Sequence, residues 1–330
     1  MEAGEPPVWP ISFEDVLEAR RRIRYHIAPT PLRRYAPLDE AVGSGIAVWV
    51  KHENHNPTNA FKARNALSAM TALSEEEKRR GVVAATRGNH GLGVAWAATL
   101  LGIPATICVP LGNNPEKNEA MRGYGAALVE EGTDYDEAVA VASRLARERG
   151  LTTIHSTNNR DVIAGAATMT LEMLEEHPGL EAMVVSVGGG SQAVGAMTVA
   201  RAARPGLRVF AVQAERASAT HDSWRAGRLI AGKSADTFAD GLATRNAYAM
   251  TFPALRAGLA GFVLVTESEM AEAVRLLLRT THNLAEGAGA AGLAGLIRLR
   301  AELAGRTVGV ILSGGNMDRE TLRRIVSREL

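Results

Sequence analysis

One lysine stands in an unusual place for its residue type. Lys62 lies in the stretch PTNAFKARNA, residues 57–66, directly after a phenylalanine and at the start of a segment with helical character. Apolar surroundings favour the neutral form of a lysine, which is both a nucleophile and a base. Lys62 is therefore a candidate nucleophile or base. The alternative interpretation is a surface lysine on a helix.

Glycine-rich segments follow several strand patterns. Gly188, Gly189 and Gly190 precede the helical stretch SQAVGAMTVARAA, so their amides and the helix N-terminus are suited to bind a phosphate. The same segment, Gly188-x-Gly190-x-x-Ala193, also matches a dinucleotide fingerprint with Glu215 as ribose partner, and a plain tight turn is a third interpretation. Ser313-Gly314-Gly315-Asn316 ends the last strand pattern and by itself indicates only a strand-to-helix turn.

A further segment has the spelling of a nucleotide-binding P-loop, Gly227-x-x-x-x-Gly232-Lys233-Ser234. That loop functions only between a buried strand and a helix. Here THDSWRA precedes it and ADTFADG follows it. We therefore reject nucleotide hydrolysis and expect Lys233 to be a solvated loop charge.

Strand and helix patterns alternate along nearly the whole chain. Strands are expected at Ala47–Lys51, Val82–Ala85, Ala105–Val109, Ala127–Glu130, Met183–Val187, Val209–Val212, Phe262–Val265 and Val308–Leu312. Ser12 with Asp15, and Thr266 with Glu269, have the spacing of capping boxes at helix starts. The alternation predicts parallel sheets covered on both faces, with ligands bound beyond the carboxyl ends of the strands.

The composition is that of an ordinary globular protein. The chain has 330 residues, 46% hydrophobic and 22% charged, which predicts two domains. A net charge of +1 provides no field to attract nucleic acid. The single Cys108 is expected to be a buried, reduced thiol, and the acidic, proline-rich N-terminus is not a secretory signal, so a cytoplasmic location fits. The uncharged residues 91–115 are interpreted as a helix and a strand rather than a membrane span.

Five motifs occur in an order that indicates a family. They are the segment from Asn56 to Lys62, Gly88-Asn89-His90-Gly91, Gly188–Gly190, Glu286 within EGAGAAG, and Ser313-Gly314-Gly315-Asn316. The sequence resembles the fold-type II pyridoxal-phosphate enzymes, and in particular the threonine/serine dehydratase and serine racemase family. The resemblance implies a tryptophan synthase β-like α/β fold: two open domains with mostly parallel sheets and the cofactor in the cleft between them. We expect residues 1–75 and 156–330 to form a large cofactor-binding domain, and residues 76–155 to form a small mobile domain.

The resemblance also implies roles for individual residues. Lys62 would hold pyridoxal 5'-phosphate as a Schiff base and then act as the general base. The other cofactor-binding residues would be Phe61, Asn89, Gly188, Gly189, Gly190, Ser191, Gly241, Glu286, Ser313 and Gly314. The substrate-binding residues would be Thr58, Thr86, Arg87, Gly88, Asn89 and His90, for several of which a capping or turn hydrogen bond is the alternative. His52 and His55 are interpreted as structural.

The implied reaction is elimination from a β-hydroxy amino acid to give a 2-oxo acid and ammonia. The hydroxyl of Ser313, unlike a carboxylate, does not stabilise a protonated pyridine ring, which favours elimination over transamination. Arg87 replaces a serine that serves racemising relatives as a second base, so we expect little racemase activity. Arg87 is instead available for an anionic or aromatic group of the substrate, or for a structural salt bridge.

Other departures concern metal binding and the substrate. Gln213 and Ala219 stand where the family pattern offers acidic cation ligands, so no metal is expected there. Changes at Asn59, Ala60 and Ser191-Gln192 alter the pocket wall. The substrate is therefore expected to be threonine- or serine-like, or bulkier, such as a phenylserine, a hydroxyaspartate or a product of hydroxyectoine breakdown.

Three alternative functions remain at this point. The first is a β-replacement synthase of the cysteine or cystathionine type, and the second is an NAD-dependent oxidoreductase based on the dinucleotide fingerprint. The third is a non-catalytic cofactor carrier. We expect a small amino acid as partner and no nucleic acid or membrane, and the family likeness implies a homodimer. The short segment after Ser313 predicts no regulatory domain.

Overall fold

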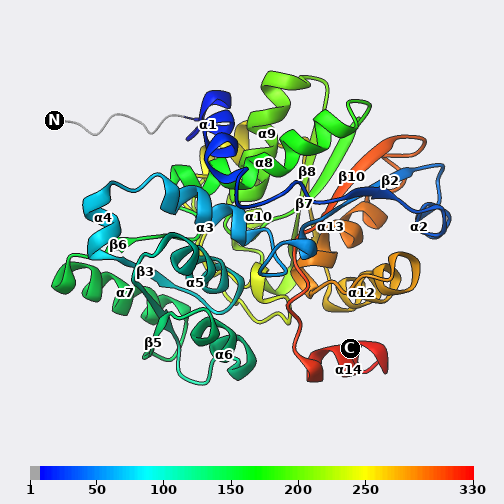
Figure 1. Cartoon of the computed structure of the whole chain (residues 1–330). Coiled ribbons are helices and arrows are strands. Elements are labelled where there is room, and N and C mark those ends of the chain that lie inside the picture. Colours follow the sequence, from blue (N-terminus) through cyan, green and yellow to red (C-terminus); the bar gives the residue numbers. More distant parts are fainter. Residues whose placement is uncertain (1–7) are drawn as a thin grey trace.

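The computed structural model describes residues 8–330 and contains two separate β-sheets (Figure 1). The larger sheet has six strands in the order β1-β2-β10-β7-β8-β9. Its strands are β1 (Leu32–Arg34), β2 (Ala47–His52), β7 (Ala182–Ser186), β8 (Arg208–Ala214), β9 (Gly261–Val265) and β10 (Thr307–Leu312). All neighbours are parallel except β1 and β2, which are antiparallel.

The smaller sheet has four parallel strands in the order β5-β4-β3-β6. They are β3 (Val82–Ala85), β4 (Ala105–Val109), β5 (Ala127–Glu130) and β6 (Thr152–Thr153). The chain leaves the larger sheet after β2, builds the whole smaller sheet, and returns to the larger sheet at β7. The domain bounds given above stay a prediction.

Helices cover both faces of the larger sheet, as parallel strands require. One face packs against α1 (Phe13–Ile23), α8 (Arg160–Glu176), α9 (Ser191–Ala203) and α11 (Phe252–Gly258). The other face packs against α2 (Ala36–Val42), α12 (Glu267–Thr281), α13 (Gly287–Arg298) and α14 (Arg319–Val326). The short α10 (Ala219–Ala226) and three 3-10 turns, η1 (Glu53–His55), η2 (Glu215–Ala217) and η3 (Asp240–Leu242), lie in connecting segments.

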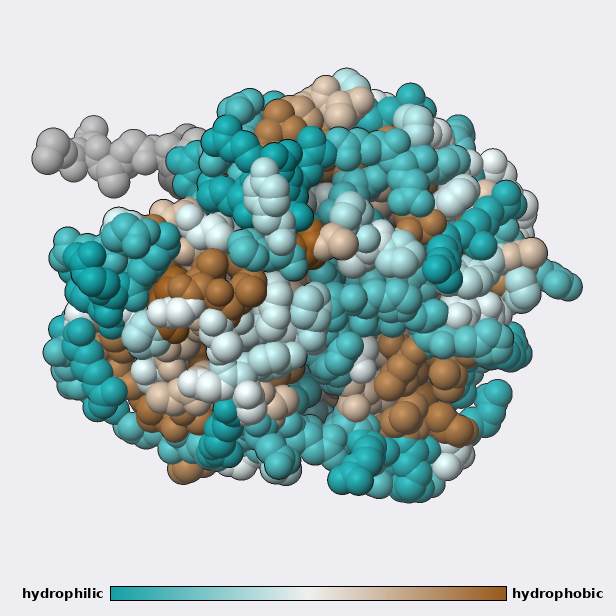
Figure 2. Space-filling model, in the orientation of Figure 1, coloured by the Kyte–Doolittle hydropathy of each residue, from teal (hydrophilic) through white to brown (hydrophobic). Residues whose placement is uncertain are grey.

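The smaller sheet is also covered on both faces, because successive side chains of a strand point to opposite sides. Val82 and Ala84 pack with α3 (Lys62–Thr71), α5 (Asn89–Leu101) and α6 (Pro115–Gly123). Val83 and Ala85 pack with α7 (Tyr135–Arg149). The short helix α4 (Glu75–Arg80) precedes β3. In Figure 2 hydrophilic residues cover most of the visible face, with hydrophobic patches near α5 and α12.

All eight predicted strands are present, with bounds that differ by two residues or fewer. The capping boxes at Ser12 and Thr266 are confirmed, and Cys108 is buried. Residues 91–115 contain most of α5 and all of β4, and within residues 8–330 no helix is both long and apolar enough to cross a membrane. The strands β1 and β6 were not predicted. The interpretation of the first seven residues lies outside the described part of the chain.

Candidate active site

A pocket lies where the carboxyl ends of β3, β7 and β10 approach the start of α3, as expected for parallel sheets. Its lining includes the predicted residues Phe61, Lys62, Thr86, Arg87, Gly88, Asn89, His90, Gly188, Gly189, Gly190, Ser191, Gly241, Glu286 and Ser313. The predicted residues Thr58 and Gly314 are not among the lining residues. The fold thus brings five motifs that are far apart in sequence to one cavity.

Lys62 is the first residue of α3, and close helix packing holds that helix in place. A Cβ added at Gly93 of α5 would lie 2.6 Å from the Lys62 carbonyl oxygen, and one at Gly165 of α8 would lie 2.6 Å from the Arg64 carbonyl oxygen. Both neighbours therefore need glycine to approach α3 so closely. The start of α3 is clamped between a helix of each sheet, which fixes where the lysine side chain begins.

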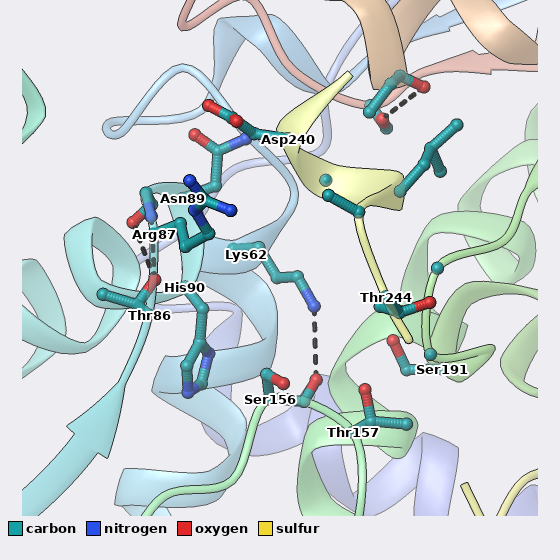
Figure 3. A pocket seen from close by; sticks show the side chains of 18 of the residues that line it. Lys62, Thr86, Arg87, Asn89, His90, Ser156, Thr157, Ser191, Asp240 and Thr244 are labelled. Carbon is teal, nitrogen blue, oxygen red and sulfur yellow. Dashed lines mark hydrogen bonds between the residues drawn. The ribbon is translucent and has the colours of Figure 1, made fainter. Parts of the chain in front are cut away.

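The Lys62 side chain extends across the pocket, between the wall that carries Arg87 and Asn89 and the loop that carries Ser156 and Thr157 (Figure 3). Its Nζ donates a hydrogen bond of 3.2 Å to the Ser156 carbonyl oxygen. Burial lowers the pKa of Lys62 to about 8. Roughly a tenth of the amine is therefore neutral at pH 7, far more than for an ordinary lysine, and the neutral form is the one that attacks a carbonyl or accepts a proton.

The loop Gly188–Gly190 presents its amide groups rather than its carbonyl groups for binding. The Gly188 carbonyl oxygen accepts a hydrogen bond of 3.0 Å from Thr220 Oγ1, and the Gly189 carbonyl oxygen accepts one of 2.7 Å from Thr251 Oγ1. Within residues 8–330 the N–H groups of the three glycines have no acceptor. The loop leads into α9, whose first N–H groups also lack intrahelical acceptors. This row of free donors suits a phosphate.

The glycines of this loop are needed for packing. A Cβ at Gly189 would lie 2.1 Å from Thr157 Oγ1, and a Cβ at Gly188 would lie 2.5 Å from the Gly241 carbonyl oxygen. Gly190 has a φ of +97°, a conformation that L side chains rarely adopt. The amide cradle therefore depends on all three residues being glycine.

A hydrogen-bonded chain joins the Asn89 motif to the last strand. Asn89 Nδ2 donates to Glu286 Oε1 at 2.5 Å, and Asn89 Oδ1 accepts from Asn316 Nδ2 at 2.8 Å. Asn316 Nδ2 also donates to the Thr58 carbonyl oxygen at 2.8 Å, which ties the loop before Lys62 to the same chain. Burial raises the pKa of Glu286 to about 7, although nearby Lys117 opposes this shift. Asn89 is therefore oriented from both sides, and its remaining amide hydrogen can reach a ligand.

Ser313 lies in the pocket lining, and its hydroxyl has only a weak partner within residues 8–330. Its hydroxyl is 3.4 Å from the Ala288 carbonyl oxygen, a long distance for a hydrogen bond between oxygens. The hydroxyl is thus available to a polar group of a ligand in the pocket. Gly314 packs closely against Glu286. A Cβ at Gly314 would lie 2.6 Å from Glu286 Oε1.

Thr86 and His90 have structural hydrogen bonds in the turn between β3 and α5. Thr86 Oγ1 accepts hydrogen bonds from the N–H groups of Gly88 (2.9 Å) and Gly91 (3.1 Å), so the hydroxyl caps the turn. His90 Nε2 lies 2.8 Å from the Ile154 carbonyl oxygen, and burial lowers the pKa of His90 to about 3. His90 is therefore neutral, with Nε2 as the donor to that carbonyl oxygen.

Sequence reasoning missed part of the pocket lining. Its lining also includes Lys117, Tyr135, Ser156, Thr157, Asp240, Thr244 and Tyr248. Ser156 and Thr157 follow the two-residue strand β6. A prediction of that strand would have placed both residues beyond its carboxyl end, where ligands bind in parallel sheets. Lys117 and Asp240 form an ion pair of 2.6 Å between α6 and η3, and no local sequence signal indicates that pair.

The competing motifs do not form sites. The P-loop spelling at Gly227 follows the helix α10, not a buried strand, and Gly227 is the left-handed residue that ends this helix. Glu215 is exposed beyond β8 and lies outside the pocket lining. Gln213 Oε1 accepts a hydrogen bond from the His221 N–H group. Across residues 8–330, no cluster of three or more His, Cys, Asp or Glu side chains is arranged to hold a metal ion.

The pocket residues fit pyridoxal phosphate. The neutral amine of Lys62 suits its aldehyde, the free amides of Gly188–Gly190 suit its phosphate, and the hydroxyl of Ser313 suits its ring nitrogen. Asn89 offers an oriented amide donor for the ring hydroxyl. These groups lie in one cavity, and each has the unsatisfied capacity that the corresponding part of the cofactor requires.

Comparisons with known proteins agree with this fit. Residues 23–314 match the family described as pyridoxal-phosphate dependent enzyme. The L-threonine ammonia-lyase of Thermotoga maritima is 37% identical over 320 residues, covering 97% of this chain and 79% of that protein. The L-threo-3-hydroxyaspartate ammonia-lyase of Saccharomyces cerevisiae is 33% identical over 316 residues, covering 96% of each. The structure of maize serine racemase is 29% identical with a TM-score of 0.91, covering 97% of this chain and 98% of that one.

Proposed function

The chain belongs to the pyridoxal-phosphate dependent enzyme family, and from this premise we propose that it eliminates water from a β-hydroxy amino acid, giving a 2-oxo acid and ammonia. Relatives at 37% and 33% identity are named as ammonia-lyases of threonine and of threo-3-hydroxyaspartate, both β-hydroxy amino acids. The observation that carries the proposal is Lys62, a lysine of lowered pKa in a pocket that also holds an amide cradle and Ser313.

Bound pyridoxal phosphate supplies an electron sink for the bond that breaks at the α-carbon. Lys62 anchors the cofactor and then takes up the α-proton at Nζ, which its lowered pKa permits near neutral pH. The amides of Gly188–Gly190 would hold the cofactor phosphate. Ser313 would offer the ring nitrogen a hydroxyl rather than a carboxylate, a partner that does not stabilise a protonated ring and so favours elimination.

The start of α5 receives the substrate carboxylate. In the first turn of α5 the N–H groups of Asn89 and His90 have no acceptor among residues 8–330, and the helix dipole favours a negative charge there. Thr86 and His90 hold this turn in shape through their own hydrogen bonds. Phe61 packs beside Lys62, whose Nζ lies 4.9 Å from the centre of the Phe61 ring.

The direct test is a panel of β-hydroxy amino acids with detection of both the 2-oxo acid and ammonia. Lys62→Ala should abolish turnover, whereas Lys233→Ala, a lysine outside the pocket lining, serves as the matched control. Borohydride reduction followed by peptide mapping should place the cofactor on Lys62. Absence of the 2-oxo acid with every substrate, or formation of a thioether when a thiol is added, would replace elimination with another reaction.

The proposal also covers assembly, domain motion and location. We propose that the enzyme is a homodimer, that residues 76–155 move as a small domain against residues 1–75 and 156–330, and that the enzyme is cytoplasmic. The family likeness supports the first two, and the composition supports the third. Light scattering of the cofactor-loaded enzyme tests the dimer, and cell fractionation tests the location.

A further inference from the structure

Arg87 is a cation at the pocket that the proposed reaction does not use. It lies in the turn between β3 and α5, its side chain is exposed, and it belongs to the pocket lining. Within residues 8–330 its guanidinium forms no ion pair, and no side-chain hydrogen bond holds it. Arginine stays protonated at any physiological pH and presents a planar fork of donors. An unpaired guanidinium facing a binding cavity is a donor set for an anion.

The other charges of the pocket lining are already compensated. Lys117 pairs with Asp240 at 2.6 Å, and the buried Glu286 accepts from Asn89 while its pKa is raised to about 7. Lys62 loses its charge above pH of about 8 and is committed to the cofactor. Among the described lining residues, Arg87 therefore carries the positive charge that is available to a ligand.

The α-carboxylate of the substrate has donors other than Arg87 at the start of α5. Thr86 occupies the N–H groups of Gly88 and Gly91, but those of Asn89 and His90 have no acceptor among residues 8–330 and are available to that carboxylate. The exposed side chain of Arg87 extends from the same wall as Asn89 towards the cavity (Figure 3). A substrate bound through its α-carboxylate would thus bring its own side chain, not its carboxylate, within reach of the guanidinium.

The opposite wall of the pocket is polar, so it is compatible with a polar substrate side chain. Tyr135 Oη lies 3.3 Å from Ser156 Oγ, and Thr157 and Tyr248 complete that wall. Thr244 Oγ1 is buried in the lining without a hydrogen-bond partner among residues 8–330. A purely aliphatic substrate would leave these hydroxyls and Arg87 without new partners.

We propose that Arg87 determines substrate specificity by binding a second carboxylate, carried on the side chain of a β-hydroxy amino acid. The inference rests on the proposed function, because it names the substrate class of the same site. Guanidinium binds a carboxylate with two parallel hydrogen bonds, which gives both affinity and orientation. Among the relatives named above, one is an ammonia-lyase of such a dicarboxylic substrate and one is an ammonia-lyase of a neutral substrate.

The test compares L-threo-3-hydroxyaspartate with L-threonine. The first carries a carboxylate on its β-carbon where the second carries a methyl group. We expect the wild-type enzyme to prefer the hydroxyaspartate. In Arg87→Gln, the KM for hydroxyaspartate divided by the KM for threonine should rise about tenfold, as expected for a charged hydrogen bond weakened by solvent. Arg87→Lys should give an intermediate ratio. Arg147→Gln, which removes an exposed arginine of α7 outside the lining, is the matched control and should keep the wild-type ratio.

A binding measurement separates this inference from the proposed function. Malate has two carboxylates and a hydroxyl but no amine, and lactate lacks the second carboxylate. Malate should raise the melting temperature of the cofactor-loaded wild-type enzyme more than lactate does, and Arg87→Gln should remove that difference. An unchanged KM ratio together with an unchanged malate effect in Arg87→Gln would overturn the role of Arg87. Failure of the wild type to release any 2-oxo acid would instead overturn the proposed reaction, while the malate comparison would still decide on Arg87.

Discussion

Four charged side chains form a buried network behind the start of α3. Arg64 donates to Glu53 Oε2 at 2.8 Å and to Glu172 Oε2 at 2.8 Å, and Lys51 Nζ lies 2.6 Å from Glu172 Oε2. The side chains of Lys51 and Glu53 are fully buried, and those of Arg64 and Glu172 are 1% and 10% exposed. Two cations and two anions balance, and the network links α3, two residues after Lys62, to β2 and α8.

The substitution Glu172→Gln keeps the size of the side chain and removes one negative charge. Lys51 and Arg64 then share Glu53 alone, which leaves one buried positive charge without a partner. Breaking a buried ion pair from one side costs about 3–5 kcal/mol, and the low exposure leaves little solvent screening to reduce this. Since domains unfold with a free energy of about 5–15 kcal/mol, the loss is large. Adding Lys51→Met restores the charge balance and should recover part of the stability.

Urea denaturation followed by both circular dichroism and tryptophan fluorescence measures this effect, and coincident transitions check that one process is observed. With a slope of about 3 kcal/mol/M, the midpoint of Glu172→Gln should fall by about 1 M or more. The matched control is Glu75→Gln, which removes the exposed partner of Lys78 and should leave the midpoint unchanged. Equal midpoints for the two single variants, or a double variant less stable than Glu172→Gln, would refute the reasoning.

Further predictions concern the cofactor cradle, acid stability, racemisation and metals. Gly189→Ala should weaken cofactor binding, because its Cβ would lie 2.1 Å from a threonine hydroxyl, whereas Gly206→Ala, with no atom within 4 Å, should bind normally; equal dissociation constants by absorbance titration would contradict this. Burial lowers the pKa of His52 to about 4 and of His90 to about 3, below the ordinary value of about 6.5 in the unfolded chain. The unfolded state then binds protons that the native state excludes, so the free energy of unfolding is greatest above pH 6.5 and declines towards pH 4, by up to about 1.4 kcal/mol per pH unit for each histidine. Thermal melts from pH 7 to pH 4.5 check this, and His52→Gln should show a shallower decline than the wild type. Because Arg87 is a poor base, chiral chromatography should detect little conversion of L-serine to D-serine, and rapid conversion would show that another residue protonates the second face. Activity should survive a chelator, and strong loss of activity would reveal a metal site.

The sequence by itself determined the local elements and the order of the motifs. The eight longer strands and the helix starts at Ser12 and Thr266 follow from interactions within a few residues, such as side-chain alternation and capping boxes. Lys62 and the loop Gly188–Gly190 were identified because their residue types are chemically demanding, and the family resemblance linked them. These features were predictable because their physical causes lie within short stretches of chain.

The tertiary structure decided which distant groups meet. The ion pair of Lys117 with Asp240, and the polar wall of Tyr135, Ser156 and Tyr248, join segments that share no local pattern. The strand β6 has two residues, too few for periodicity, and it exists because it pairs with β3. The lowered pKa of Lys62, and the lack of a partner for Arg87 in the described part of the chain, likewise depend on what surrounds each side chain. Burial and partner choice are properties of the packed chain, because they arise from contacts between residues that are close only after folding.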